Sequence, residues 1–154
     1  MSREQHICES ITEQLRTVSG IRIYDQVLMN KFETYQFDFV GIYGSTDERI
    51  VESLEDLSSV ANIGRIDVYL LCGNSVKKNA TLGIARLRNA MQDLNEKVEH
   101  VLQNYVPSRY DSDYEATDFS PISYSASEPV TFTDDETKGL SIMTFRVFYT
   151  RFQK

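Results

Sequence analysis

The longest regular hydrophobic spacing lies in the middle of the chain, between about residues 80 and 105. Apolar residues recur there at alternating steps of three and four, at Ile84, Leu87, Met91, Leu94, Val98, Val101 and Tyr105. This spacing places them on one side of a helix. A coiled coil and a helix laid across a sheet both fit, and the short run of three heptads favours the helix on a sheet. Val106-Pro107 should end the helix, since the residue before proline is pushed out of helical geometry.

A second helix is predicted at the start of the chain, from Ser2 to Ser19. Ser2 and Gln5 have the spacing of a capping box, and Gly20 stands where a left-handed C-terminal cap would lie. Its apolar stripe consists of Ile7, Ile11, Leu15 and Val18.

Alternating patterns predict strands in the next part of the chain. A short strand is expected at 21–24 and a better one over Tyr35 to Tyr43. The apolar phase of the second strand changes beside Gly41, which indicates a bulge or bend. Arg65 to Cys72 is apolar on both faces in its second half, which is typical of a central strand.

The stretch from Thr46 to Ala61 has no clear period. Ile50, Leu54, Leu57 and Ala61 have helical spacing, which favours a short helix, with a loop as the alternative.

The last third predicts a loop and a hairpin. Ser108 to Ser120 is rich in Tyr, Asp and Ser and should be a surface loop, and Pro121 to Thr133 and Leu140 to Phe152 should pair as strands. In the final strand one face is fully apolar, with Met143, Phe145, Val147 and Tyr149. We therefore expect one α+β domain over residues 1–154. Its mixed, mainly antiparallel sheet of about four to six strands should be packed by the N-terminal helix and the long amphipathic helix.

Composition is that of an ordinary globular domain, with 41% hydrophobic and 25% charged residues. No apolar run approaches the roughly 20 residues that cross a bilayer, so no membrane partner is expected. The first twenty residues carry Glu4, Glu9 and Glu13 where a signal peptide would be apolar, which predicts a chain that stays in the cytoplasm.

The net charge of −7 is concentrated in one stretch, residues 108–136. That stretch holds one base, Arg109, and eight acids: Asp111, Asp113, Glu115, Asp118, Glu128, Asp134, Asp135 and Glu136. Binding to a nucleic-acid backbone needs clustered Lys and Arg, and the sequence has no such cluster. The acidic stretch is either a solvated loop or a like-charged wall that keeps DNA from sticking.

Candidate chemistry is sparse, and we expect no catalytic, cofactor or metal site. Cys8 and Cys72 are too few for a disulfide framework and should be small buried residues. His6 and His100 stand apart from other ligand types. Asp111, Asp113 and Glu115 imitate the opening of a calcium loop, but the loop's glycine and final glutamate are replaced, respectively, by alanine and isoleucine.

The order of elements resembles that of the tail terminator, or tail completion, proteins of long-tailed bacteriophages. The resemblance is carried by four segments: GIRIYD (Gly20 to Asp25), YQFDFVGIYG (Tyr35 to Gly44), IDVYLLCGNSVKKNATLGIARLRNAMQDLNEKVEHVL (Ile66 to Leu102) and the final GLSIMTFRVFYTRF (Gly139 to Phe152). It covers nearly the whole chain and rests on element order instead of an invariant motif. The apparent extra helix between Ile50 and Ala61 departs from it.

This resemblance implies a non-enzymatic virion protein, assembled in the host cytoplasm and placed at the joint of tail and head. Its partners would be further copies of itself in a hexameric ring, the tail tube protein and the head connector protein, with DNA passing through the lumen without specific binding. Residues expected at a subunit contact or at the lumen are Tyr105, Tyr110, Asp111, Asp113, Tyr114, Glu115, Asp118, Phe119, Asp134, Asp135 and Glu136. Two alternatives stay open: another neck or head-completion component, and a small enzyme or ligand-binding domain with its pocket between the long helix and the sheet.

Overall fold

The computed structural model describes residues 1–50, 61–76, 83–133 and 137–154. The elements are α1 (Arg3–Leu15), β1 (Arg22–Tyr24), the 3-10 helix η1 (Met29–Thr34), β2 (Phe39–Ile50), β3 (Ala61–Ser75), α2 (Gly83–Leu102), β4 (Tyr110–Asp111), β5 (Glu115–Phe119), β6 (Ser123–Phe132) and β7 (Lys138–Gln153). Within the described residues seven strands form one sheet, in which β1 and β2 pair in parallel and the other pairs are antiparallel. The predicted α+β class with a mainly antiparallel sheet is confirmed, although short strands raise the strand number above the expected range.

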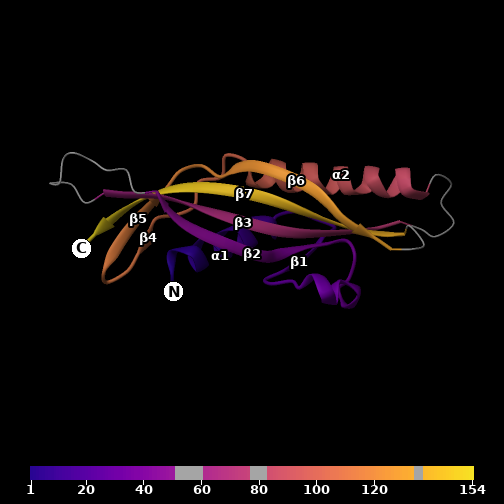
Figure 1. Cartoon of the computed structure of the whole chain (residues 1–154), viewed down its shortest axis with the longest axis horizontal. Coiled ribbons are helices and arrows are strands. Elements are labelled where there is room, and N and C mark those ends of the chain that lie inside the picture. The colour runs from indigo at the N-terminus through magenta and orange to yellow at the C-terminus, as the bar shows by residue number, and fades with distance from the viewer. Residues whose placement is uncertain (51–60, 77–82, 134–136) are drawn as a thin grey trace.

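Three long strands, β2, β3 and β7, form an elongated ribbon (Figure 1). As predicted, β3 is central, between β2 and β7. The other edge of β7 pairs first with β6 and then, from Tyr149 onward, with β5. The outer edge of β2 pairs with β1 only over Phe39–Gly41.

Both α-helices pack on one face of the ribbon, where their apolar stripes and the sheet form the larger core. The stripe of the long helix is confirmed at Leu87, Met91, Leu94 and Val98, all of which are buried. The helix ends at Leu102, before the predicted Val106. Asn104 has a left-handed φ of 67°, the conformation that commonly closes a helix.

A smaller core lies on the opposite face, over one end of the ribbon. Its buried members are Val27, Phe39, Leu71 and Leu140, and residues between Tyr24 and Phe37 pack against them. The second predicted strand therefore begins at Phe39 instead of Tyr35. A bulge lies between Ile42 and Gly44, close to the predicted place beside Gly41, but it does not cause the change of phase. The change of phase arises because Phe39 faces this smaller core while Val40 faces the helices.

The prediction of a short helix over Thr46 to Ala61 is wrong at both ends of that range. Residues 46–50 belong to β2 and Ala61 begins β3, with Arg49 opposite Gly64 in an antiparallel register. Backbone pairing along the ribbon outweighs the helical spacing of four apolar residues. The intervening residues, 51–60, lie outside the described part of the chain.

The loop expected over Ser108 to Ser120 contains two strands instead. β7 extends beyond β6, and β5 pairs with this extension, with Phe119 opposite Tyr149. The N-terminal helix is correctly placed but shorter than predicted, since it ends at Leu15. The Ser2 hydroxyl accepts the Gln5 N–H at 3.1 Å, as the capping pattern predicts. Gly20 has the expected left-handed φ, +80°, but it does not cap the helix, whose C-cap is Arg16.

Candidate interaction surfaces

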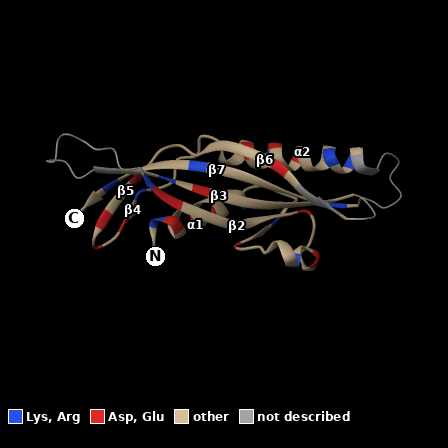
Figure 2. Cartoon of the chain, in the orientation of Figure 1, with Lys and Arg blue, Asp and Glu red and all other residues tan. Residues whose placement is uncertain are grey.

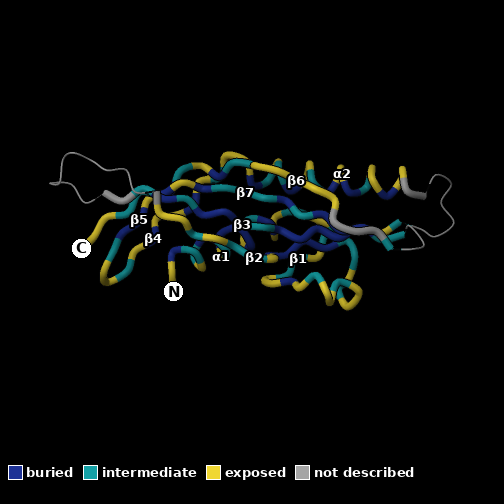
Figure 3. Tube along the Cα trace, in the orientation of Figure 1, coloured by how far each residue is buried: buried dark blue, intermediate teal, exposed yellow. Residues whose placement is uncertain are grey.

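Among the described residues, the face of the ribbon opposite the helices is covered at only one end. Beyond the smaller core, alternate residues of three paired strands point away from the helices: Thr46 and Glu48 from β2, Arg65, Asp67 and Tyr69 from β3, and Thr144, Arg146, Phe148 and Phe152 from β7. We call this surface the open face. Figure 3 shows that exposed and half-buried residues alternate with buried ones along much of β7.

Exposed aromatic rings and fixed ion pairs lie together on the open face. Phe148 and Phe152 are each 42% exposed. Beside them the Arg146 Nε lies 2.8 Å from Asp67 Oδ1, and the Arg65 Nη2 lies 2.9 Å from Glu48 Oε2. The hydrogen bond to Asp67 raises the pKa of the Arg146 guanidinium. Apolar rings among preset polar groups are typical of protein contact surfaces.

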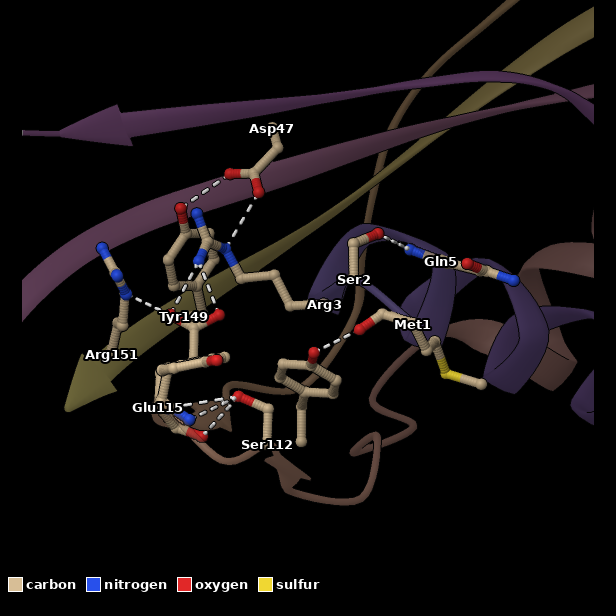
Figure 4. Close-up of polar contacts among 11 residues, drawn as sticks. Met1, Ser2, Arg3, Gln5, Asp47, Ser112, Glu115, Tyr149 and Arg151 are labelled. Atoms are coloured by element: carbon tan, nitrogen blue, oxygen red, sulfur yellow. Dashed lines mark hydrogen bonds and ion pairs between the residues drawn. The ribbon is translucent and has the colours of Figure 1, made fainter. Parts of the chain in front are cut away.

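A dense cluster of charges lies on the helix side, at the end of the ribbon near both termini (Figure 4). The Arg3 Nε is 2.9 Å from Asp47 Oδ2, and its Nη1 is 3.1 Å from Glu115 Oε1. Glu115 also pairs with Arg151, and the Tyr149 hydroxyl donates to Asp47 Oδ1 at 2.6 Å. We call these five residues the clasp.

The clasp joins α1 to three strands and is balanced, with two cations facing two carboxylates. The Arg3 guanidinium carbon lies 4.7 Å above the Tyr149 ring, and side-chain exposure of the four charged members is 10–17%. Burial, followed by the hydrogen bond and charge of Asp47, raises the pKa of Tyr149 to about 12. Held by these ion pairs, the group acts as a structural tie between distant segments.

The sequence contains a signal for the clasp that segment-by-segment reasoning missed. Arg3 stands four residues before Ile7 and so continues the buried stripe of α1. Arg151 likewise follows Tyr149 in the buried phase of β7. A charged residue at a position that the apolar pattern makes buried should have a buried partner of opposite charge.

The predicted acidic and aromatic residues are spread over different environments. Tyr110 and Phe119 are buried in the larger core and are not available as surface anchors, and Glu115 belongs to the clasp. Tyr105 is half-buried, whereas Tyr114 is 83% exposed.

Exposed acids remain near the β4–β5 hairpin: Asp111, Asp113 and Asp118. A hydrogen bond from Lys154 lowers the pKa of Asp111, and Arg109 lies 3.7 Å from Asp118. Figure 2 shows acidic residues on the β4–β5 hairpin with basic residues near them, at the end of the ribbon that carries the C-terminus. The predicted positions Asp134, Asp135 and Glu136 lie outside the described residues.

Metal-binding and thiol chemistry find little support in the part of the chain that the structure describes. No group of three or more His, Cys, Asp or Glu residues there could hold a metal ion. Burial raises the pKa of both thiols, that of Cys72 to about 12. The His6 Nε2 lies 2.9 Å from the Ser108 carbonyl oxygen, which ties α1 to the segment before β4.

Grooves lie beside both helices, and two of them are lined by a helix and a strand. The first, of about 670 Å³, lies between α1 and the edge of β2 and is lined by residues that include Glu4, Glu9, Glu13, Tyr43 and Ser45. The second, of about 500 Å³, lies between α2 and β6, where Asn95 bonds Ser127 and Ser141.

Neither the protein-family models nor the curated proteins compared with this chain give a match. None of the helices in the described ranges is long and apolar enough to cross a membrane. Assignment of a function therefore rests on the surfaces themselves.

Proposed function

We propose that this chain is a structural subunit that closes into a ring, caps the tail tube of a long-tailed bacteriophage and joins it to the head connector. The resemblance in element order supplies the biological setting. The physical support is the open face, which leaves Phe148 and Phe152 exposed beside two ion pairs.

The asymmetry of the molecule suits head-to-tail association. Helices cover one face of the ribbon, and the described residues leave part of the other face bare, so a subunit offers two unlike surfaces to its neighbours. Heterologous contacts of this kind generate rings when the rotation between subunits closes. In such a ring the open face packs on a neighbour, and the exposed Asp111, Asp113 and Asp118 face the channel, where like charge keeps DNA from adhering.

The test is the assembly state of the purified chain over a range of concentrations, by sedimentation velocity and negative-stain microscopy. Wild-type protein should form rings. The double substitution Phe148→Glu with Phe152→Glu should leave a monomer with unchanged far-ultraviolet circular dichroism. Tyr114→Glu is the matched control, because Tyr114 is exposed but lies off the open face, and it should assemble like wild type.

Two results would contradict the proposal. A wild-type chain that stays monomeric at every concentration, alone and with purified tail tubes, would exclude ring formation. Rings that persist in the double variant would show that the open face is not the contact.

A ligand-binding domain is the second candidate, and the groove between α2 and β6 favours it. Tyr124, Ser127 and Ser141 line this groove together with Asn95, so an apolar ring and several polar groups converge. A ligand seated there would raise the melting temperature. A screen of small-molecule classes by thermal shift, repeated with Asn95→Leu, would support this candidate if a stabilising compound loses its effect in the variant.

A further inference from the structure

The outer edge of β2 is paired over only part of its length. β1 pairs with Phe39–Gly41, and one more bond follows, from the Val27 N–H to the Ile42 carbonyl at 2.9 Å. Beyond this point no segment among the described residues pairs with that edge of β2. An unpaired strand edge presents backbone donors and acceptors on which another strand can form.

Helix α1 runs beside this free edge and forms the wall of the first groove. Ile42, Tyr43, Gly44 and Ser45 line the strand side. Tyr43 is 41% exposed, which leaves an aromatic surface at the groove. An extended chain lying here would continue the line of β1, with alternate side chains directed toward α1.

The helix wall is acidic. Five charged residues line the groove: Glu4, Glu9, Glu13, Asp25 and Arg16. Arg16 and Asp25 neutralise each other in an ion pair of 2.7 Å. The three glutamates have no cation partner in the described part of the chain, although Glu4 accepts a hydrogen bond from Ser45.

We propose that this groove binds an extended, lysine- or arginine-bearing segment of a partner protein, which adds as a strand to the free edge of β2 between Tyr43 and Arg49. Backbone pairing supplies the register, and the three glutamates select for basic side chains at alternate positions.

A second copy of this chain is a poorer occupant. Its other sheet edges in the described residues are β1, β4 and β6. β1 is only three residues long, which is shorter than the segment from Tyr43 to Arg49, and residues 110–137, which contain β4 and β6, have no lysine or arginine. β6 also carries Glu128 and Pro129, and proline cannot donate to a strand ladder. The glutamates of the groove would repel such an edge.

The groove contains its own reporter, Cys8. This thiol is half-buried and lines the groove, whereas Cys72 is fully buried. A bound strand should therefore slow alkylation of Cys8 by iodoacetamide, measured by mass spectrometry on the full chain.

The probe is a labelled peptide of alternating lysine and valine, as long as the segment from Tyr43 to Arg49. Fluorescence anisotropy should show saturable binding that weakens with salt, and Cys8 alkylation should slow in parallel. A peptide of equal charge with proline in place of valine should not bind, because it lacks the backbone donors of a strand. A glutamate–valine peptide should not bind either.

The decisive variant combines Glu9→Lys with Glu13→Lys, since both residues are exposed on α1. It should weaken binding of the lysine–valine peptide by roughly five- to tenfold. The matched control, Asp93→Lys with Glu96→Lys, makes the same charge change on exposed positions of α2 and should stay within about twofold of wild type.

Three outcomes would overturn the proposal: no binding of the lysine–valine peptide, equal binding of the proline peptide, or equal losses in both double variants. Self-association that protects Cys8 without any peptide would also overturn it, in favour of a second copy. The substitutions of Glu9 and Glu13 leave the open face unchanged. Ring formation and peptide binding are therefore separate tests, and either one can fail without the other.

Discussion

Helix α1 carries charges on two sides, and their surroundings differ. Arg3 is 9% exposed and pairs with Asp47 and Glu115 inside the clasp. Glu9 and Glu13, on the side facing the groove, are exposed and have no cation partner among the described residues. Charges of the first kind tie segments together, and their loss should destabilise the fold. Charges of the second kind contribute little to folding, so their value must be sought in recognition.

The strongest test of this contrast is Arg3→Ala. The substitution leaves Asp47 and Glu115 in a largely dry site with one cation fewer, so the free energy of unfolding should fall by about 2 to 3 kcal/mol. Urea denaturation measures the change.

Arg16→Ala is the matched control, since the Arg16–Asp25 pair has side-chain exposures of 55% and 81%. Its free energy of unfolding should change by less than about 0.5 kcal/mol. Similar small losses in both variants would mean that solvent screens the clasp as it screens a surface pair.

The clasp also depends on a glycine. A Cβ atom on Gly64 would lie 2.2 Å from Tyr149 Cζ and 2.3 Å from its hydroxyl oxygen. Gly64→Ala must therefore push the ring off β3 and disturb its bond to Asp47, which should lower the free energy of unfolding by about 1 to 3 kcal/mol. Gly44→Ala serves as control, because its nearest contact would be 3.9 Å away. Equal stability of the two variants in urea would contradict this view of the ring.

Patterns confined to one segment predicted much of this fold. The stripe of α2 and the central position of β3 both follow from the spacing of apolar residues within their own segments. The errors have a common cause. Residues 46–50 and 115–119 become strands because distant strands, β3 and β7, offer them an edge, and local spacing does not contain that information.

The candidate surfaces were less predictable than the fold. The acid content of residues 108–136 predicted an acidic surface stretch there. Glu115, however, is held by Arg3 from the far end of the sequence. The open face combines residues of three strands whose register is fixed only in the folded sheet. The glutamates of α1 are evident in the sequence. The unpaired strand edge beside them is not, because it depends on where β1 ends in the folded sheet.

A smaller effect should appear in the pH dependence of the clasp. The pKa of Tyr149 is raised from its ordinary 10 to about 12, so as pH rises the unfolded chain loses this proton first. Wild-type stability should therefore fall between pH 10 and pH 12 by an amount that Tyr149→Phe lacks. Below pH 10 the variant should be less stable by about 1 kcal/mol, for want of the bond to Asp47. If the difference in free energy of unfolding between wild type and Tyr149→Phe, measured in urea, stays constant up to pH 12, ionisation of Tyr149 is not coupled to folding.

The smallest expected change is a gain. Glu13 lies in the last turn of α1, which contains no base, and it stands four residues after Glu9. A carboxylate there opposes the helix dipole and repels its neighbour, so Glu13→Lys should raise the free energy of unfolding by about 0.5 kcal/mol. Glu4→Gln should act in the opposite direction, because Glu4 is in the first turn and accepts a bond from Ser45. If urea unfolding shows the gain while affinity for the lysine–valine peptide falls, the Glu13 carboxylate opposes folding and supports binding, as a recognition residue should. A loss of stability in Glu13→Lys would instead give this carboxylate a structural role, and the contrast between the two sides of α1 would not hold.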